Sequence, residues 1–249
     1  SSLNVSSDLD VDGTTNLDVV DIDGAVDMAS TLQVDGAITG SSTINGVGIK
    51  YNISNFSQSL LISNDAGTGT LSSASNNTGL GHEVFDDLTS GDQNTGVGSL
   101  ALTKLTTGGN NTGIGTVALT ALTTGSSNTA VGDNALAANT TANNNTAVGA
   151  SALLSNTTGA NNTAIGSIAG QSITTGDANV AIGRNTLSNT TTGGSNIAIG
   201  LSSLESNTTA SNNTAVGHEA LNANTTGIQN TAVGSLALDA NTTGQFNVA

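Results

Sequence analysis

One spacing governs most of this sequence: an asparagine recurs every 17 residues, without insertion or deletion, over ten successive steps. We take this asparagine as position 0 of a repeating unit and number the residues after it 1 to 16. It falls at Asn77, Asn94, Asn111, Asn128, Asn145, Asn162, Asn179, Asn196, Asn213, Asn230 and Asn247. So strict a period indicates that each unit makes one turn of a stacked structure. The unit is too short for a helix–turn–helix repeat and is rich in Thr, Asn and Gly, so it predicts an all-β parallel β-solenoid (β-roll).

Composition excludes several other classes. The chain has 249 residues and no Cys, and only 2% of its residues are aromatic, far fewer than a globular core of this size uses. Disorder is disfavoured because 35% of the residues are hydrophobic and these recur with the period. A net charge of −15 argues against nucleic acid as a partner, and the absence of a long apolar run argues against membrane insertion.

Three regions follow from the change of rhythm. In residues 1–50 apolar residues recur every six positions, as in Val20, Val26 and Leu32, which predicts short strands wound with other chains into an intertwined β shaft. Residues 51–76 are a transition, in which residues 60–63 resemble a degenerate capping coil one residue out of phase. Residues 77–249 hold ten to eleven repeats, and we expect the chain to be a piece of a longer polypeptide.

Within a coil, β-branched or aliphatic residues occupy positions 1 and 3, Gly or Ala occupies position 2, and Leu dominates position 8. Alternate residues of a strand share a face, so we expect positions 1, 3 and 8 to be buried and position 2 to face outward. The Gly at position 4 predicts a corner with positive φ, and the Thr pair at positions 12 and 13 a second strand edge.

Two rows of residues are then expected along the stack. The position 0 asparagines from Asn77 to Asn230 should form a ladder of side-chain amides. The small outward position 2 row should pack against symmetry mates and so form the oligomer face; its alanines are Ala130, Ala147, Ala164, Ala181, Ala198, Ala215 and Ala232.

The phrases NNTAVG, NNTAIG, SNIAIG and ANVAIG resemble the head repeats of trimeric autotransporter adhesins, and similar repeats occur in phage tail fibres and bacterial surface fibres. The resemblance covers residues 77–249. It implies a left-handed parallel β-roll, with three rolls packed around an axis that the position 2 row faces. The coil here is longer than the family's, and Thr usually stands at position 1 where the family prefers an aliphatic residue.

Catalytic chemistry is not indicated. His82 and His218, each followed by Glu, are eight coils apart and lack the rest of a zinc protease motif, so we interpret them as solvated corner residues. Asp8, Asp10 and Asp12 mimic the start of an EF-hand loop, but Val19 stands where the bidentate Glu belongs. We therefore expect no metal and no cofactor, with Asp8, Asp10 and Asp12 as the candidate ligands if calcium binds between chains. Sequons such as the one at Asn139 are intrinsic to the repeat and carry little information.

These features predict a non-enzymatic attachment fibre: a homotrimeric shaft or spacer of an adhesin, filament or phage tail fibre, on a cell surface or virion. Recognition of a host receptor is expected outside this segment, which is poor in aromatic residues. The alternative is an ice-binding solenoid that uses the paired threonines at positions 12 and 13. Two adjacent threonines, however, would place only one of each pair outward.

Overall fold

The computed structural model describes residues 42–44, 47–53, 55–63 and 70–249, and it contains no helix among them. The longer strands come first: β1 (Ser42–Ile44), β2 (Val47–Ile53) and β3 (Phe56–Ser63), followed by the two-residue β4 (Ala74–Ser75). Ten three-residue strands follow, one in each coil: β5 (Thr78–Leu80), β6 (Thr95–Val97), β7 (Thr112–Ile114), β8 (Thr129–Val131), β9 (Thr146–Val148), β10 (Thr163–Ile165), β11 (Val180–Ile182), β12 (Ile197–Ile199), β13 (Thr214–Val216) and β14 (Thr231–Val233).

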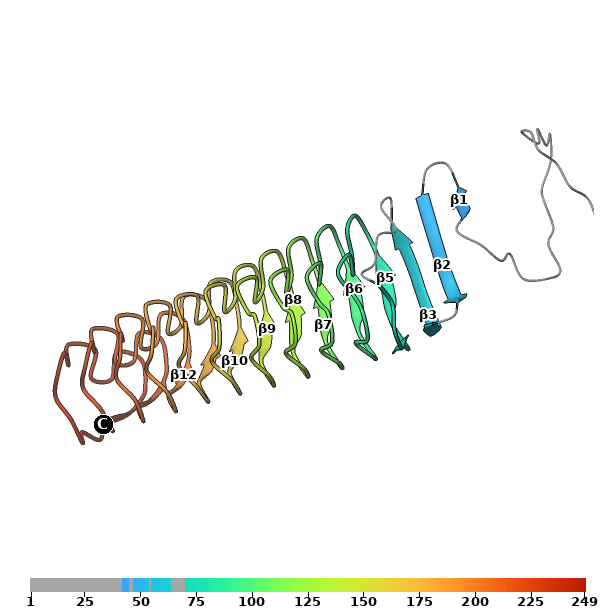
Figure 1. Cartoon of the computed structure of the whole chain (residues 1–249). Coiled ribbons are helices and arrows are strands. Elements are labelled where there is room, and N and C mark those ends of the chain that lie inside the picture. Colours follow the sequence, from blue (N-terminus) through green and yellow to red (C-terminus); the bar gives the residue numbers. More distant parts are fainter. Residues whose placement is uncertain (1–41, 45–46, 54, 64–69) are drawn as a thin grey trace, which may run out of the picture. The chain divides into compact units, whose positions relative to one another are not determined.

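The strands β5 to β14 lie side by side in sequence order and pair in parallel throughout (Figure 1). Every residue pairs with the one 17 positions further on, as Ala147 does with Ala164. Hydrogen bonds between coils continue past the strands, for example from Leu136 N to Ala152 O at 3.0 Å. This confirms the parallel β-solenoid with 17-residue coils. No strand forms at positions 12 and 13, where a second strand edge was expected; those residues are bends.

The glycine at position 4 is required by both conformation and space. Gly132 has a φ of 139°, in the region that L side chains avoid. A Cβ added to it would lie 2.6 Å from the carbonyl carbon of Gly149, the same position in the next coil. The predicted corner is confirmed.

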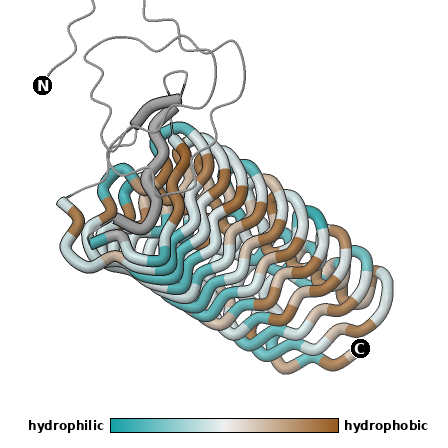
Figure 2. The backbone as a smooth tube through the Cα atoms, turned by 90° about the vertical axis from the view of Figure 1, so that its right-hand side faces the viewer, coloured by the Kyte–Doolittle hydropathy of each residue, from teal (hydrophilic) through white to brown (hydrophobic). Residues whose placement is uncertain are grey.

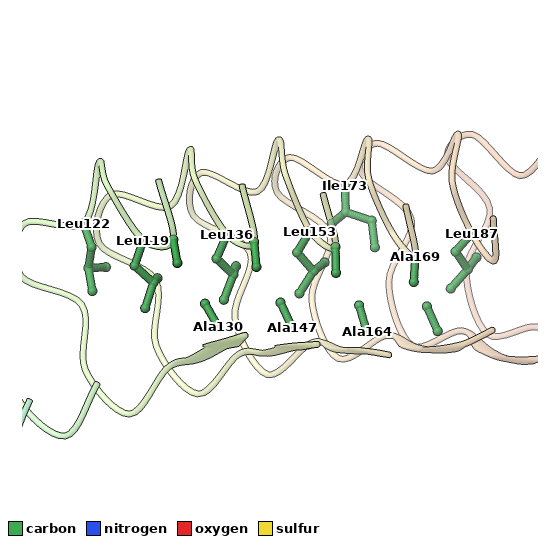
Figure 3. Packing of buried hydrophobic residues seen from close by; sticks show 14 of the residues in the cluster. Leu119, Leu122, Ala130, Leu136, Ala147, Leu153, Ala164, Ala169, Ile173 and Leu187 are labelled. Carbon is green, nitrogen blue, oxygen red and sulfur yellow. The ribbon is translucent and has the colours of Figure 1, made fainter. Parts of the chain in front are cut away.

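Each strand faces the other way from the expectation: position 2 points into the coil, and positions 1 and 3 point outward. Ala130, Ala147 and Ala164 at position 2 are fully buried, whereas their neighbours at positions 1 and 3 are half-buried or exposed. Figure 3 shows these alanines pointing from the strand into the coil, toward Leu136 and Leu153 of the opposite wall. The prediction that position 8 is buried is confirmed, but the prediction that positions 1 and 3 are buried is wrong. Val131, Val148 and Val216 point outward, so Val148→Asp would not place a charge in the core.

The small residues fit because the opposite wall fills the interior. A Cβ on Gly79 would lie 3.0 Å from Phe85, one on Gly96 would lie 3.3 Å from Phe85, and one on Gly113 would lie 3.2 Å from Leu102. Position 2 is therefore small because Leu or Phe at position 8 reaches across a narrow coil. From the sequence alone, the restriction of position 2 to Gly and Ala suggests contact with a neighbouring subunit instead.

The interior uses more positions than the sequence predicted. Positions 0, 2, 7, 8, 11 and 14 are buried in coil after coil, and Figure 2 shows hydrophobic residues recurring at the same places along the stack. Position 11 begins as Leu88, Leu105 and Leu122 and then changes to buried Asn139 and Asn156. Because the residue type changes along the stack, the sequence did not predict that position 11 is buried.

The turn after the strand reverses the sign of φ at alternate residues. Positions 4, 6 and 8 are all positive, and Leu136 at position 8 has a φ of 51°. A left-handed leucine costs about 1–2 kcal/mol. Burying its side chain returns about 1.5–3 kcal/mol, so the turn is tolerated where the side chain reaches the core.

The first coil joins an antiparallel region. β3 pairs in parallel with β5 on one side and antiparallel with β2 on the other, and β2 in turn pairs antiparallel with β1. Leu60 pairs with Thr78, 18 residues away, so the end of β3 lies one residue out of phase with the repeat, as expected. Residues 1–41, which carry most of the predicted intertwined shaft, lie outside the described residues.

Candidate interaction surface

The residues at positions 1 and 3 of β5 to β14 form a continuous outward face, which we call the outer strip. Its side chains are Thr, Val, Ile and Leu only. Several are well exposed for their size: Ile114 is 39% exposed, Ile165 41% and Ile197 41%. A row of exposed aliphatic residues along ten adjacent strands is unusual for a surface that meets only water.

The outer strip carries no charge. From Asn77 onward the chain has nine acidic and two basic residues, all at positions 5, 6, 9, 10 or 15. They are Glu83, Asp86, Asp87, Asp92, Lys104, Asp133, Asp177, Arg184, Glu205, Glu219 and Asp239. The face that exposes the aliphatic residues is therefore one on which two copies of this acidic chain can approach without direct repulsion.

The predicted asparagine ladder is confirmed. The Nδ2 group of Asn145 donates to Asn128 Oδ1 at 3.3 Å and to Gly159 O at 2.9 Å, and Asn145 Oδ1 accepts the backbone N–H of Asn162 at 2.9 Å. The backbone N–H of every ladder residue from Asn94 to Asn247 donates to the preceding Oδ1. Because these amides are buried and paired on both sides, they fix the height of each coil against the next.

The predicted oligomer face is wrong. Ala130, Ala147, Ala164, Ala181, Ala198, Ala215 and Ala232 are at most 1% exposed within the single chain and belong to its own core. A neighbouring subunit cannot reach them without opening the coil. The exposed face of these strands is the outer strip, on the opposite side from these alanines.

Position 11 supplies a second set of buried amides that sequence reasoning missed. Asn139 Nδ2 donates to Ala142 O at 3.4 Å and Asn224 Nδ2 to Gly227 O at 2.9 Å, so the sequon asparagines in this row are internal hydrogen-bonding groups. Asn156 Oδ1, in contrast, is buried without a partner. The recurrence of Leu88, Leu105 and Leu122 at this position could have identified it as buried.

The two histidines lie on the surface, as predicted. His82 Nε2 is 3.6 Å from Glu83 Oε1, and His218 Nε2 is 3.4 Å from Glu219 Oε1. Their side chains are nearly half exposed, so each pair contributes little to stability. In the part of the chain that the structure describes, no three His, Cys, Asp or Glu residues gather as metal ligands. Asp8, Asp10 and Asp12 fall outside that part.

The two threonines at positions 12 and 13 have different roles: the first bonds to the next coil and the second faces solvent. The position 12 hydroxyls donate to backbone carbonyls of the next coil, as Thr157 Oγ1 does to Thr174 O at 3.1 Å, whereas Thr158 at position 13 is exposed. Only one threonine of each pair therefore faces solvent, as the alternation along the chain predicts.

This division gives a direct prediction. Replacing Thr157 with Val should lower the free energy of unfolding by about 1 kcal/mol, because an inter-coil hydrogen bond is lost. The matched change Thr158→Val should alter it by no more than about 0.5 kcal/mol. Urea midpoints measured by circular dichroism check both values. Equal effects would contradict the division of roles.

None of the family models, curated proteins or solved structures compared with the chain matches it. The described residues also contain no helix long and apolar enough to cross a membrane. The functional argument therefore depends on the geometry of the coil and of the outer strip.

Proposed function

We propose that this chain is a non-enzymatic shaft or spacer of an extracellular attachment fibre, assembled as a parallel homotrimer. The observation that carries the proposal is the unbroken register of ten coils whose outward strand face exposes uncharged Thr, Val, Ile and Leu. Because the coils repeat without insertions, their number determines the length of the stack. The aliphatic face along that length favours association with further copies of the chain.

The energetics favour assembly over a lone solenoid. The outer strip exposes aliphatic side chains in every coil, and removing apolar surface from water contributes about 25 cal/mol per Å². A contribution repeated over ten coils becomes large even though each three-residue strand is small. The strand face is also regular enough to meet a second copy of itself.

The mass of the purified chain tests assembly. We expect sedimentation equilibrium to give three times the chain mass of 24.2 kDa, with the same species present over a wide concentration range. A stable monomer at high concentration would overturn the trimer and, with it, this use of the outer strip.

The spacer role is tested by deleting whole coils. Removing residues 128–161, which are two coils, should leave the remaining ladder in phase, keep the assembly intact and shorten the stack by roughly 10 Å, about 4.8 Å per coil. Removing residues 128–153 would break the phase and should disrupt folding. An in-phase deletion that unfolded the chain would show that the coils are not interchangeable units.

Ice binding stays as a second candidate, now on a different face. In most coils the outer strip presents Thr at position 1 and Val or Ile at position 3, a regular array of hydroxyl and methyl groups on parallel strands. Val180 and Ile197 interrupt its threonine row. Thermal hysteresis from a monomeric chain would favour this function, whereas a trimer without hysteresis would favour the fibre.

A further inference from the structure

The outer strip is not uniform along the stack. Position 1 is Thr in every strand from β5 to β14 except two neighbours, β11 and β12, where it is Val180 and Ile197. With Ile182 and Ile199 at position 3, both outward positions of these two strands are aliphatic. We call these four residues the aliphatic patch.

The aliphatic patch is exposed within the single chain. Ile197 is 41% and Ile199 36% exposed, Val180 and Ile182 are half-buried, and Leu201 just beyond the corner is 42% exposed. The strands pair directly, Val180 with Ile197 and Ile182 with Ile199, so the four side chains form one contiguous surface. A contiguous exposed apolar surface of this kind typically marks a site of protein association.

The geometry points to one occupant. We propose that the aliphatic patch anchors self-association and meets the same patch of a second copy, with the chains parallel and in register; this inference rests on the proposed fibre. Because the outer strip is uncharged while nine acidic and only two basic residues lie at other positions of the coils, contact there avoids the repulsion that those other faces would meet.

The proposed trimer requires the parallel arrangement. A three-fold axis along the stack relates three chains that all run in the same direction, whereas an antiparallel pair cannot be part of such a ring. The parallel, in-register arrangement places every strand against its equivalent and covers all ten outward aliphatic rows.

The repeat itself supplies conservative test variants. In Val180→Thr/Ile197→Thr, each substitution inserts the residue that the other eight strands carry at this position, so the coil should fold unchanged. We expect the dissociation constant of the assembly to rise at least roughly tenfold, because the apolar surface buried at the anchor is reduced. Thr163→Val, which extends the patch to β10, should lower the dissociation constant.

Ile228→Ser provides the control. Ile228 lies at position 15, outside the outer strip, where Ser126 and Ser211 occur in other coils. Sedimentation equilibrium of all variants should show weaker association only for Val180→Thr/Ile197→Thr, while circular dichroism confirms that each is folded. Association as tight as that of the unmodified chain would overturn the anchor but leave the fibre standing. An unmodified chain that stays monomeric would overturn both.

Discussion

Changing Asn145 to Asp should destabilise the solenoid by about 3–5 kcal/mol at neutral pH, although the two side chains have nearly the same shape. In the native chain Asn145 Nδ2 donates to Gly159 O and to Asn128 Oδ1, and its side chain is fully buried. An aspartate there has no N–H to offer, so its charge would face two acceptor oxygens without water. The hydrogen bond from Asn162 N–H, at 2.9 Å, would remain but cannot offset that repulsion.

The loss should depend on pH in a defined direction. Burial and the neighbouring acceptors raise the pKa of the new carboxyl group in the folded state above its unfolded value. Below the unfolded pKa the group is protonated in both states and can donate to Gly159 O, so the variant should approach the stability of the unmodified chain. Stability is then lost as the pH rises through the folded pKa. Urea midpoints at acidic and neutral pH, followed by circular dichroism, measure this difference.

The neighbouring residue provides a matched control. Asn144 at position 16 is exposed, so Asn144→Asp adds the same charge one residue away without burying it. It should change the free energy of unfolding by no more than about 0.5 kcal/mol. If the two variants behaved alike, or if Asn145→Asp lost no stability at neutral pH, the ladder would not be what holds the coils in place.

The fold could be predicted from the spacing of a single residue. Asn77 to Asn247 recur without a length change, and in a parallel stack this alone sets the register that pairs Ala147 with Ala164. The glycine corner and the amide ladder followed for the same reason, because residues that recur at every turn must suit a fixed environment.

Which face of each strand is buried could not be predicted from the spacing. Alternation says that positions 1 and 3 share a face but not which face is inside, and the β-branched residues there suggested a core. What decides the matter is the width of the coil: the side chains of Phe85 and Leu102 already occupy the interior opposite Gly96 and Gly113. That contact joins positions 2 and 8, and no pattern within the strand reveals it.

One coil departs from the rule at position 8, and its departure is compensated within the same coil. Gly170 replaces the usual leucine, and Ile173 at position 11 is fully buried nearby. A Cβ on Gly170 would lie 3.0 Å from Ile173 Cδ1 and 3.1 Å from Leu153 Cδ2. Ile173 therefore occupies the space into which a leucine at position 170 would extend.

Each single substitution in this pair should be costly. Gly170→Leu alone should destabilise the chain by about 1–3 kcal/mol, because the added side chain overpacks against Ile173 and Leu153. Ile173→Asn alone should cost about 2–5 kcal/mol, because it empties part of the core beside a glycine. The positive φ of 58° at Gly170 is not the obstacle, since Leu153 and Leu187 adopt nearly the same value at position 8.

The double variant Gly170→Leu/Ile173→Asn should return to within about 1.5 kcal/mol of the unmodified chain, because the two changes restore the Leu and Asn pair of the coil that contains Leu153 and Asn156. The new amide would lie where it can donate to Asn156 Oδ1, a buried acceptor that has no partner in the native chain. Its own oxygen would lie near the N–H of Gly176, as Asn139 Oδ1 lies 3.1 Å from Ala142 N. A double-mutant cycle from urea unfolding measures the coupling, and losses that simply added would show that Gly170 and Ile173 do not share one space.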